Sequence, residues 1–170
     1  MRPTHIAVIG AGDDDTPARI LAAAETVGRA IGQAGAVLVC GGRGGVMEAA
    51  CRGARAAGGV TVGILPGSDP SEANPHVEIV VPTGMGDARN ALVVRAGDAV
   101  VAVDGGYGTL SEIALALVTG TPVVGITTWE LARCGEPDGR IERVDDPARA
   151  VARALELAKG QGRDRPSDRG

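Results

Sequence analysis

The chain has 170 residues, about the length of a single domain. Hydrophobic residues make up 44% of it and charged residues 22%, which is typical of a globular protein and excludes a wholly disordered chain. The formal net charge of −4 predicts no nucleic-acid partner, because proteins that bind nucleic acids usually carry a basic excess.

The apolar runs of the sequence alternate with helical patterns, and both are bounded by glycine or proline. Strands are predicted at 5–10, 37–40, 60–64, 77–81, 99–103 and 122–126, and helices at 17–33, 46–57, 87–96, 110–118 and 147–158. Strands that are apolar on both faces must be covered by helices on both sides. We therefore expect an α/β fold: a Rossmann-like parallel sheet of about six strands in a single domain, residues 1–159. The polar segment 160–170 is predicted to be a disordered tail.

Lysine and cysteine usage excludes several kinds of site. The only lysine, Lys159, adjoins the polar tail, whereas a pyridoxal Schiff base or a P-loop needs a lysine inside the fold. The three cysteines lack the spacing of a zinc site or a disulfide framework, so we expect no metal. The sequence shows no leader-like segment and no apolar run of about 18 residues. It therefore predicts a cytoplasmic protein with no membrane partner.

In a parallel sheet, ligands bind beyond the carboxyl ends of the strands, so the loops at that edge are the candidates for a site. The first such loop, residues 10–15 (GAGDDD), begins like a dinucleotide-binding fingerprint. An aspartate replaces the third glycine, and three adjacent carboxylates would repel a pyrophosphate. We interpret this loop as an ordinary turn between a strand and a helix.

The second loop, residues 41–45 (GGRGG), follows a strand and precedes a helix. Here Gly42, Gly44 and Gly45 would let backbone N–H groups approach an anion, and Arg43 would add a positive charge. A flexible turn with a solvent-exposed arginine is the alternative. Four glycines around one arginine favour phosphate binding.

The third loop, residues 104–109 (DGGYGT), again lies between a strand and a helix. Gly105, Gly106, Tyr107 and Gly108 lead into Thr109, whose hydroxyl and N–H would face the point to which the helix dipole is directed. Two phosphate-competent loops at the same sheet edge predict one phosphate-bearing ligand that spans both.

Two charged residues accompany these loops. Glu112 either closes a capping box with Thr109 or places a carboxylate at the mouth of the site. Arg89 is predicted in the first turn of a helix, where it opposes the helix dipole and needs an anion or a carboxylate as a partner.

The motifs GGRGGVMEA and GGYGTLSE, with Arg89 between them, resemble the "lonely guy" superfamily, whose members were formerly labelled lysine decarboxylases. In its phosphoribohydrolase branch, the resemblance implies that Arg89 and Glu112 are the catalytic pair that cleaves the N-glycosidic bond of a nucleoside 5′-monophosphate. Asp87, Asn90 and Asp104 depart from that branch's pattern. The chain looks closer to the short subgroup that includes molybdenum cofactor carrier proteins, which implies binding of a phosphate-bearing pterin without turnover. The resemblance also implies a homodimer or a higher homo-oligomer.

Three functions follow from these observations. The favoured one is binding of a phosphate-bearing nucleotide or a molybdenum cofactor-like pterin, with no other cofactor required. The second is an N-glycosidase that uses Arg89 and Glu112, and the third is a regulatory Rossmann-type scaffold with a protein partner.

Overall fold

The computed structural model describes residues 2–12 and 15–161 and contains a seven-stranded, all-parallel sheet. The strand order is β4-β3-β2-β1-β5-β6-β9. The strands are β1 (His5–Gly10), β2 (Val37–Cys40), β3 (Val60–Leu65), β4 (Ile79–Pro82), β5 (Ala99–Val103), β6 (Val123–Ile126) and β9 (Ile141–Arg143). This arrangement confirms the predicted α/β, Rossmann-like fold in one domain.

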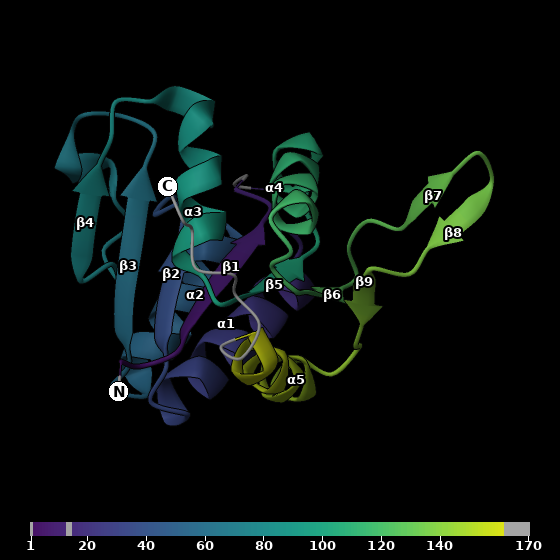
Figure 1. Ribbon diagram of the computed structural model, residues 1–170. Coiled ribbons are helices and arrows are strands. Elements are labelled where there is room, and N and C mark those ends of the chain that lie inside the picture. Colours follow the sequence, from purple (N-terminus) through teal and green to yellow (C-terminus); the bar gives the residue numbers. More distant parts are fainter. Residues whose placement is uncertain (1, 13–14, 162–170) are drawn as a thin grey trace.

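Helices cover both faces of the sheet (Figure 1). The first face packs on α1 (Ala18–Gln33), α2 (Val46–Ala56) and α5 (Pro147–Gln161), and the second on α3 (Asn90–Ala96) and α4 (Tyr107–Val118). Two short 3-10 helices, η1 (Pro70–Glu72) and η2 (Gly86–Arg89), lie in the connections. Every residue of β5 is buried, which is the burial expected for a central strand covered on both sides.

Helices α1 and α2 are in close contact where Gly28 meets Ala50. A Cβ atom on Gly28 would lie 1.8 Å from the Ala50 carbonyl oxygen. The two backbones therefore touch, and any side chain at residue 28 would push α1 away from α2. This contact holds the first two helices against the face of the sheet that they share.

The structure adds elements that the apolar pattern did not predict. Strand β9 carries one buried residue, Ile141, and therefore lacks an apolar run. A hairpin of β7 (Leu131–Arg133) and β8 (Glu136–Asp138) projects from the body beside β6 (Figure 1). Helix α5 continues through residues 160 and 161, beyond the predicted end of the domain, and 162–170 lie outside the described residues.

No helix in the described part of the chain is long and apolar enough to cross a membrane.

Candidate functional site

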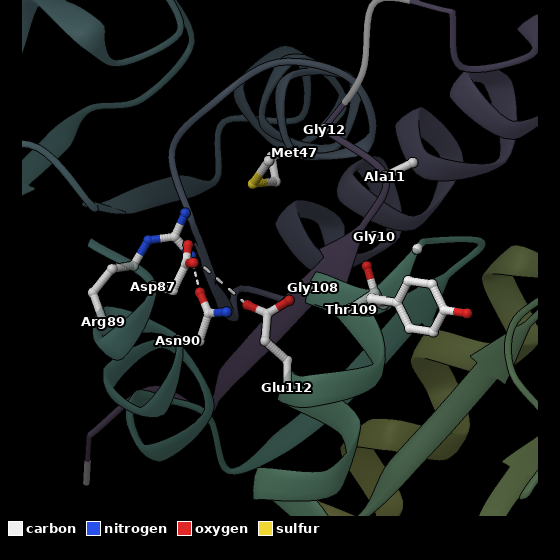
Figure 2. A pocket seen from close by; sticks show the side chains of 12 residues that line it. Gly10, Ala11, Gly12, Met47, Asp87, Arg89, Asn90, Gly108, Thr109 and Glu112 are labelled. Carbon is white, nitrogen blue, oxygen red and sulfur yellow. Dashed lines mark hydrogen bonds and ion pairs between the residues drawn. The ribbon is translucent and has the colours of Figure 1, made fainter. Parts of the chain in front are cut away.

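A cavity of about 320 Å³ opens at the carboxyl edge of the sheet, where the ends of β1 and β5 are adjacent. The sheet order reverses direction here: β2, β3 and β4 extend to one side of β1, and β5, β6 and β9 to the other. This is the topological switch point at which doubly wound sheets bind their ligands. The cavity is lined by Gly10, Ala11, Gly12, Met47, Asp87, Arg89, Asn90, Gly106, Tyr107, Gly108, Thr109 and Glu112 (Figure 2).

The first turn of α4 forms one wall of this cavity. Tyr107, Gly108 and Thr109 are the first three residues of the helix, after the N-cap Gly106. Their N–H groups have no acceptor within the helix, because the i−4 carbonyls would lie before its start. The positive end of the helix dipole therefore faces the cavity together with these donors, an arrangement that suits an anion.

Gly105 is required for this turn. Its φ is +110°, and a Cβ atom there would lie 2.3 Å from the Thr109 Oγ1. Thr109 is buried and lines the cavity. The capping-box alternative for Thr109 and Glu112 is wrong, because the helix begins at Tyr107 and not after Thr109.

Arg89 reaches the cavity from the end of η2 and is only 8% exposed. Its Nη1 donates to the Asn90 Oδ1 at 2.6 Å, and its Nη2 donates to the Gly41 carbonyl at 3.5 Å. Its Nε has no partner among the described residues. A guanidinium has five N–H donors, so Arg89 keeps hydrogen-bonding capacity for a ligand.

Glu112 faces Arg89 across the cavity, with 3.8 Å between its Oε1 and the Arg89 Nη1 (Figure 2). Burial raises the pKa of Glu112 to about 7, while the positive charge of Arg89 acts in the opposite direction. Burial likewise lowers the pKa of Arg89, which Glu112 opposes. The carboxyl is therefore partly protonated near neutral pH, which reduces the negative charge that Glu112 adds to a cavity lined also by Arg89 and Asp87.

Asn90 links the two walls. It accepts a hydrogen bond from Arg89, and its Nδ2 donates to the Ser111 Oγ at 3.3 Å. The Ser111 hydroxyl in turn donates to the Gly108 carbonyl at 2.7 Å. The guanidinium is thus held at a defined position relative to the first turn of α4.

The structure brings together only part of the predicted site. Arg89, Glu112 and the residues of the third loop from Gly106 to Thr109 line the cavity, and Gly105 shapes the turn behind them. Gly42, Arg43, Gly44 and Gly45 do not line it. The Arg43 side chain lies 3.9 Å from the Glu72 carboxylate, both largely exposed, as in a surface ion pair.

The loop after the first strand, residues 10–15, was interpreted as an ordinary turn. Its first three residues lie at the cavity wall where the second loop, residues 41–45, was expected. Gly10, Ala11 and Gly12 line the cavity, while Asp13 and Asp14 lie outside the described residues. The second loop supports it from behind, because a Cβ atom on Gly45 would lie 2.4 Å from the Ala11 carbonyl oxygen. Val46, the first residue of α2, donates its N–H to the same oxygen at 2.8 Å. Gly10 and Gly12, at the end of the first strand, were the available sequence signal for this loop. Met47, Asp87 and Asn90 lie at or beside the motifs that resemble the "lonely guy" superfamily, but they were not predicted as site residues.

No cluster of three or more His, Cys, Asp or Glu residues that would hold a metal ion occurs within 2–12 and 15–161.

Comparison with known proteins matches the SLOG cluster4 family over residues 3–152. Among solved structures, the molybdenum cofactor binding protein of Rippkaea orientalis is 36% identical, with a TM-score of 0.82 over 95% of this chain and 98% of that one. The Moco carrier protein of Chlamydomonas reinhardtii is 36% identical, with a TM-score of 0.81 over 94% and 99%. An uncharacterized protein of Archaeoglobus fulgidus is 46% identical over 127 residues, 74% of this chain and 82% of its own length.

These matches cover the predicted motifs from the first strand to the last helix, and they confirm the resemblance to the "lonely guy"-like proteins and, among them, to molybdenum cofactor carriers. With its parallel sheet and its cavity at the junction of β1 and β5, the chain belongs to the SLOG cluster4 family.

Proposed function

We propose that this protein binds a phosphate-bearing pterin of the molybdenum cofactor type and does not turn it over. The observation that carries the proposal is the convergence in one cavity of the Arg89 guanidinium and the first-turn N–H groups of α4. The phosphate would rest between these two groups of donors. The cavity volume of about 320 Å³ is near the lower end of the range for small-molecule sites.

The similar solved structures support the pterin as the ligand. Their names describe a molybdenum cofactor binding protein and a Moco carrier protein, and both align over nearly the whole of this chain. A carrier needs a cavity that holds its cargo without reacting with it. The site offers hydrogen-bond donors and a partly protonated carboxyl, which suit retention of an anion.

The proposal is tested by calorimetry with the air-oxidised, phosphate-retaining form of molybdopterin. Thr109→Val removes one hydroxyl from the cavity wall and should weaken binding about tenfold, the loss expected for a hydrogen bond to a charged group. Thr119→Val is the matched control: its hydroxyl bonds the Leu115 carbonyl at the other end of α4. No saturable binding to the wild type, or equal losses in both variants, would contradict the proposal.

A second candidate function is hydrolysis of the N-glycosidic bond of a nucleoside 5′-monophosphate. The observation in its favour is Glu112, a buried carboxyl with its pKa raised to about 7 beside the expected phosphate position. In its ionised form it would stabilise the oxocarbenium-like transition state, with the phosphate held by the first turn of α4.

A panel of nucleoside 5′-monophosphates separates the two functions. Base released at enzymatic rates by the wild type but not by Glu112→Ala would establish the hydrolase and exclude a pure carrier. Saturable pterin binding without base release would establish the carrier.

We also propose a homo-oligomer that buries the α3 side of the sheet. Ile79 of β4 is 48% exposed and Leu92 of α3 is 38% exposed, and Ile79 pairs in register with Val62, which packs on this face. Exposed apolar side chains on one face are typical of an interface. By light scattering, Leu92→Glu should lower the molar mass to that of the monomer; a monomeric wild type would contradict the proposal.

A further inference from the structure

The chain contains one Trp, one Tyr and no Phe, and its two aromatic rings are in contact. The ring centroids of Tyr107 and Trp129 are 5.5 Å apart, with an angle of 41° between the planes. Tyr107 lines the cavity, yet it is 81% exposed. Tyr107 therefore lies at the rim of the candidate site, and Trp129 lies behind it.

Trp129 is held in place by the loop that precedes α4. Its indole Nε1 donates to the Gly106 carbonyl at 3.1 Å, and the neighbouring Thr128 donates through its Oγ1 to the Asp104 carbonyl at 2.7 Å. The indole also packs against the core between the sheet and α4. Its only N–H donor is thus engaged within the protein, and its ring forms a fixed support for Tyr107.

Tyr107 combines two contributions in one residue. Its backbone N–H belongs to the first turn of α4, the proposed anion site, and its exposed side chain lines the cavity beside that turn. Leaving a ring of this size exposed forgoes the stabilisation that its burial would supply. A planar ring that covered Tyr107 would recover part of that stabilisation.

Building on the proposed function, we propose that Tyr107 is the platform on which the heterocyclic ring of the ligand stacks, with Trp129 as the positioning residue behind it. The pair selects a phosphate that carries a flat, bicyclic nitrogen heterocycle over a phosphate without one. The first turn of α4 and Arg89 bind the anion, while Tyr107 supplies the preference for the ring.

The test compares two ligands by calorimetry: air-oxidised molybdopterin, which has both ring and phosphate, and inorganic phosphate, which has no ring. Tyr107→Ala should weaken molybdopterin binding about tenfold, as expected for loss of one stacking contact, and leave phosphate binding unchanged. Tyr107→Phe should retain wild-type affinity for both. Val118→Ala, at an 85% exposed position near the end of the same helix, is the matched control.

Trp129→Leu provides the readout for the positioning role. It should lower the ratio of molybdopterin affinity to phosphate affinity, because Tyr107 loses its support. An equal loss for both ligands would mean that Trp129 only holds Gly106 in place, and would overturn its assigned role.

The outcomes distinguish this proposal from the one on which it rests. If the wild type binds molybdopterin and Tyr107→Ala binds it equally well, or loses affinity for both ligands alike, the stacking platform is overturned and the proposed carrier function stands. If the wild type binds neither ligand, the carrier function is overturned and the platform with it.

Discussion

The titration of Glu112 makes a quantitative prediction about stability. Burial raises the pKa of this carboxyl from 4.5 in its unperturbed state to about 7 in the folded protein. Between these two values the folded state holds a proton that the unfolded state has released. The contribution of Glu112 to stability is therefore greatest below pH 4.5 and is lost as the pH rises toward 7.

The size of the effect follows from that difference. Each pKa unit corresponds to about 1.4 kcal/mol, so the titration of Glu112 should remove about 3 kcal/mol of unfolding free energy over this range. Such a loss is a large fraction of the stability of an ordinary domain, roughly 5–15 kcal/mol. Glu112→Gln keeps the size and polarity of the side chain but does not titrate.

The assay is urea-induced unfolding of the wild type and Glu112→Gln at a series of pH values, followed by the fluorescence of the single tryptophan. Other titrating groups contribute equally to both proteins and cancel in the difference between their pH profiles. The wild type should lose about 3 kcal/mol more than the variant between pH 4.5 and pH 7. Parallel profiles would refute a raised pKa and, with it, the partly protonated cavity.

Three further changes test the same structure. Arg89→Ala should destabilise the protein by roughly 3 kcal/mol at pH 8, where Glu112 is ionised and loses its cation, and much less at pH 5, as measured by urea unfolding; equal losses would contradict the pairing. Gly106→Val should leave the fold intact, because a Cβ atom there meets nothing within 4 Å, and its side chain should weaken phosphate binding at least about tenfold in calorimetry. Unchanged affinity would reject this turn as the anion site. Gly28→Ala should cost about 3 kcal/mol or more by thermal unfolding, because its Cβ would collide with the Ala50 carbonyl; a cost near zero would show that the contact between α1 and α2 yields.

The central strands were predictable because a strand that is buried on both faces appears in the sequence as a short apolar run. The runs 5–10, 37–40 and 99–103 are apolar and rich in β-branched residues, and the structure forms strands with these same bounds. Strand β9 was not predictable, since an edge strand with one buried residue has no such run. The start of helix α4 was predicted at residue 110, whereas the helix begins at Tyr107. The prediction was late because glycine has a low helix propensity, so a glycine-rich segment does not look like the start of a helix.

The site was partly predictable for a related reason. A glycine loop between a strand and a helix indicates anion donors whatever its neighbours are, which is how the first turn of α4 was found. The pKa of Glu112 depends on the elements that bury it, which raise the pKa, and on the charge of Arg89, which lowers it. The sequence alone left Glu112 with two alternatives because it contains no record of that environment.

By itself, then, the sequence determined the α/β class, the central strands and the glycine-rich turn at the start of α4 that we propose as the anion site, since each depends on neighbouring residues along the chain. The strand order was decided only in the tertiary structure, which pairs β1 with β5 and so sets the loop at residues 10–12 across the cavity from α4. The glycine-rich loop after β2 lies one strand away and serves as a support. The physical reason is that strand order depends on how the crossover helices pack on the sheet, a contact between distant segments that no local pattern encodes.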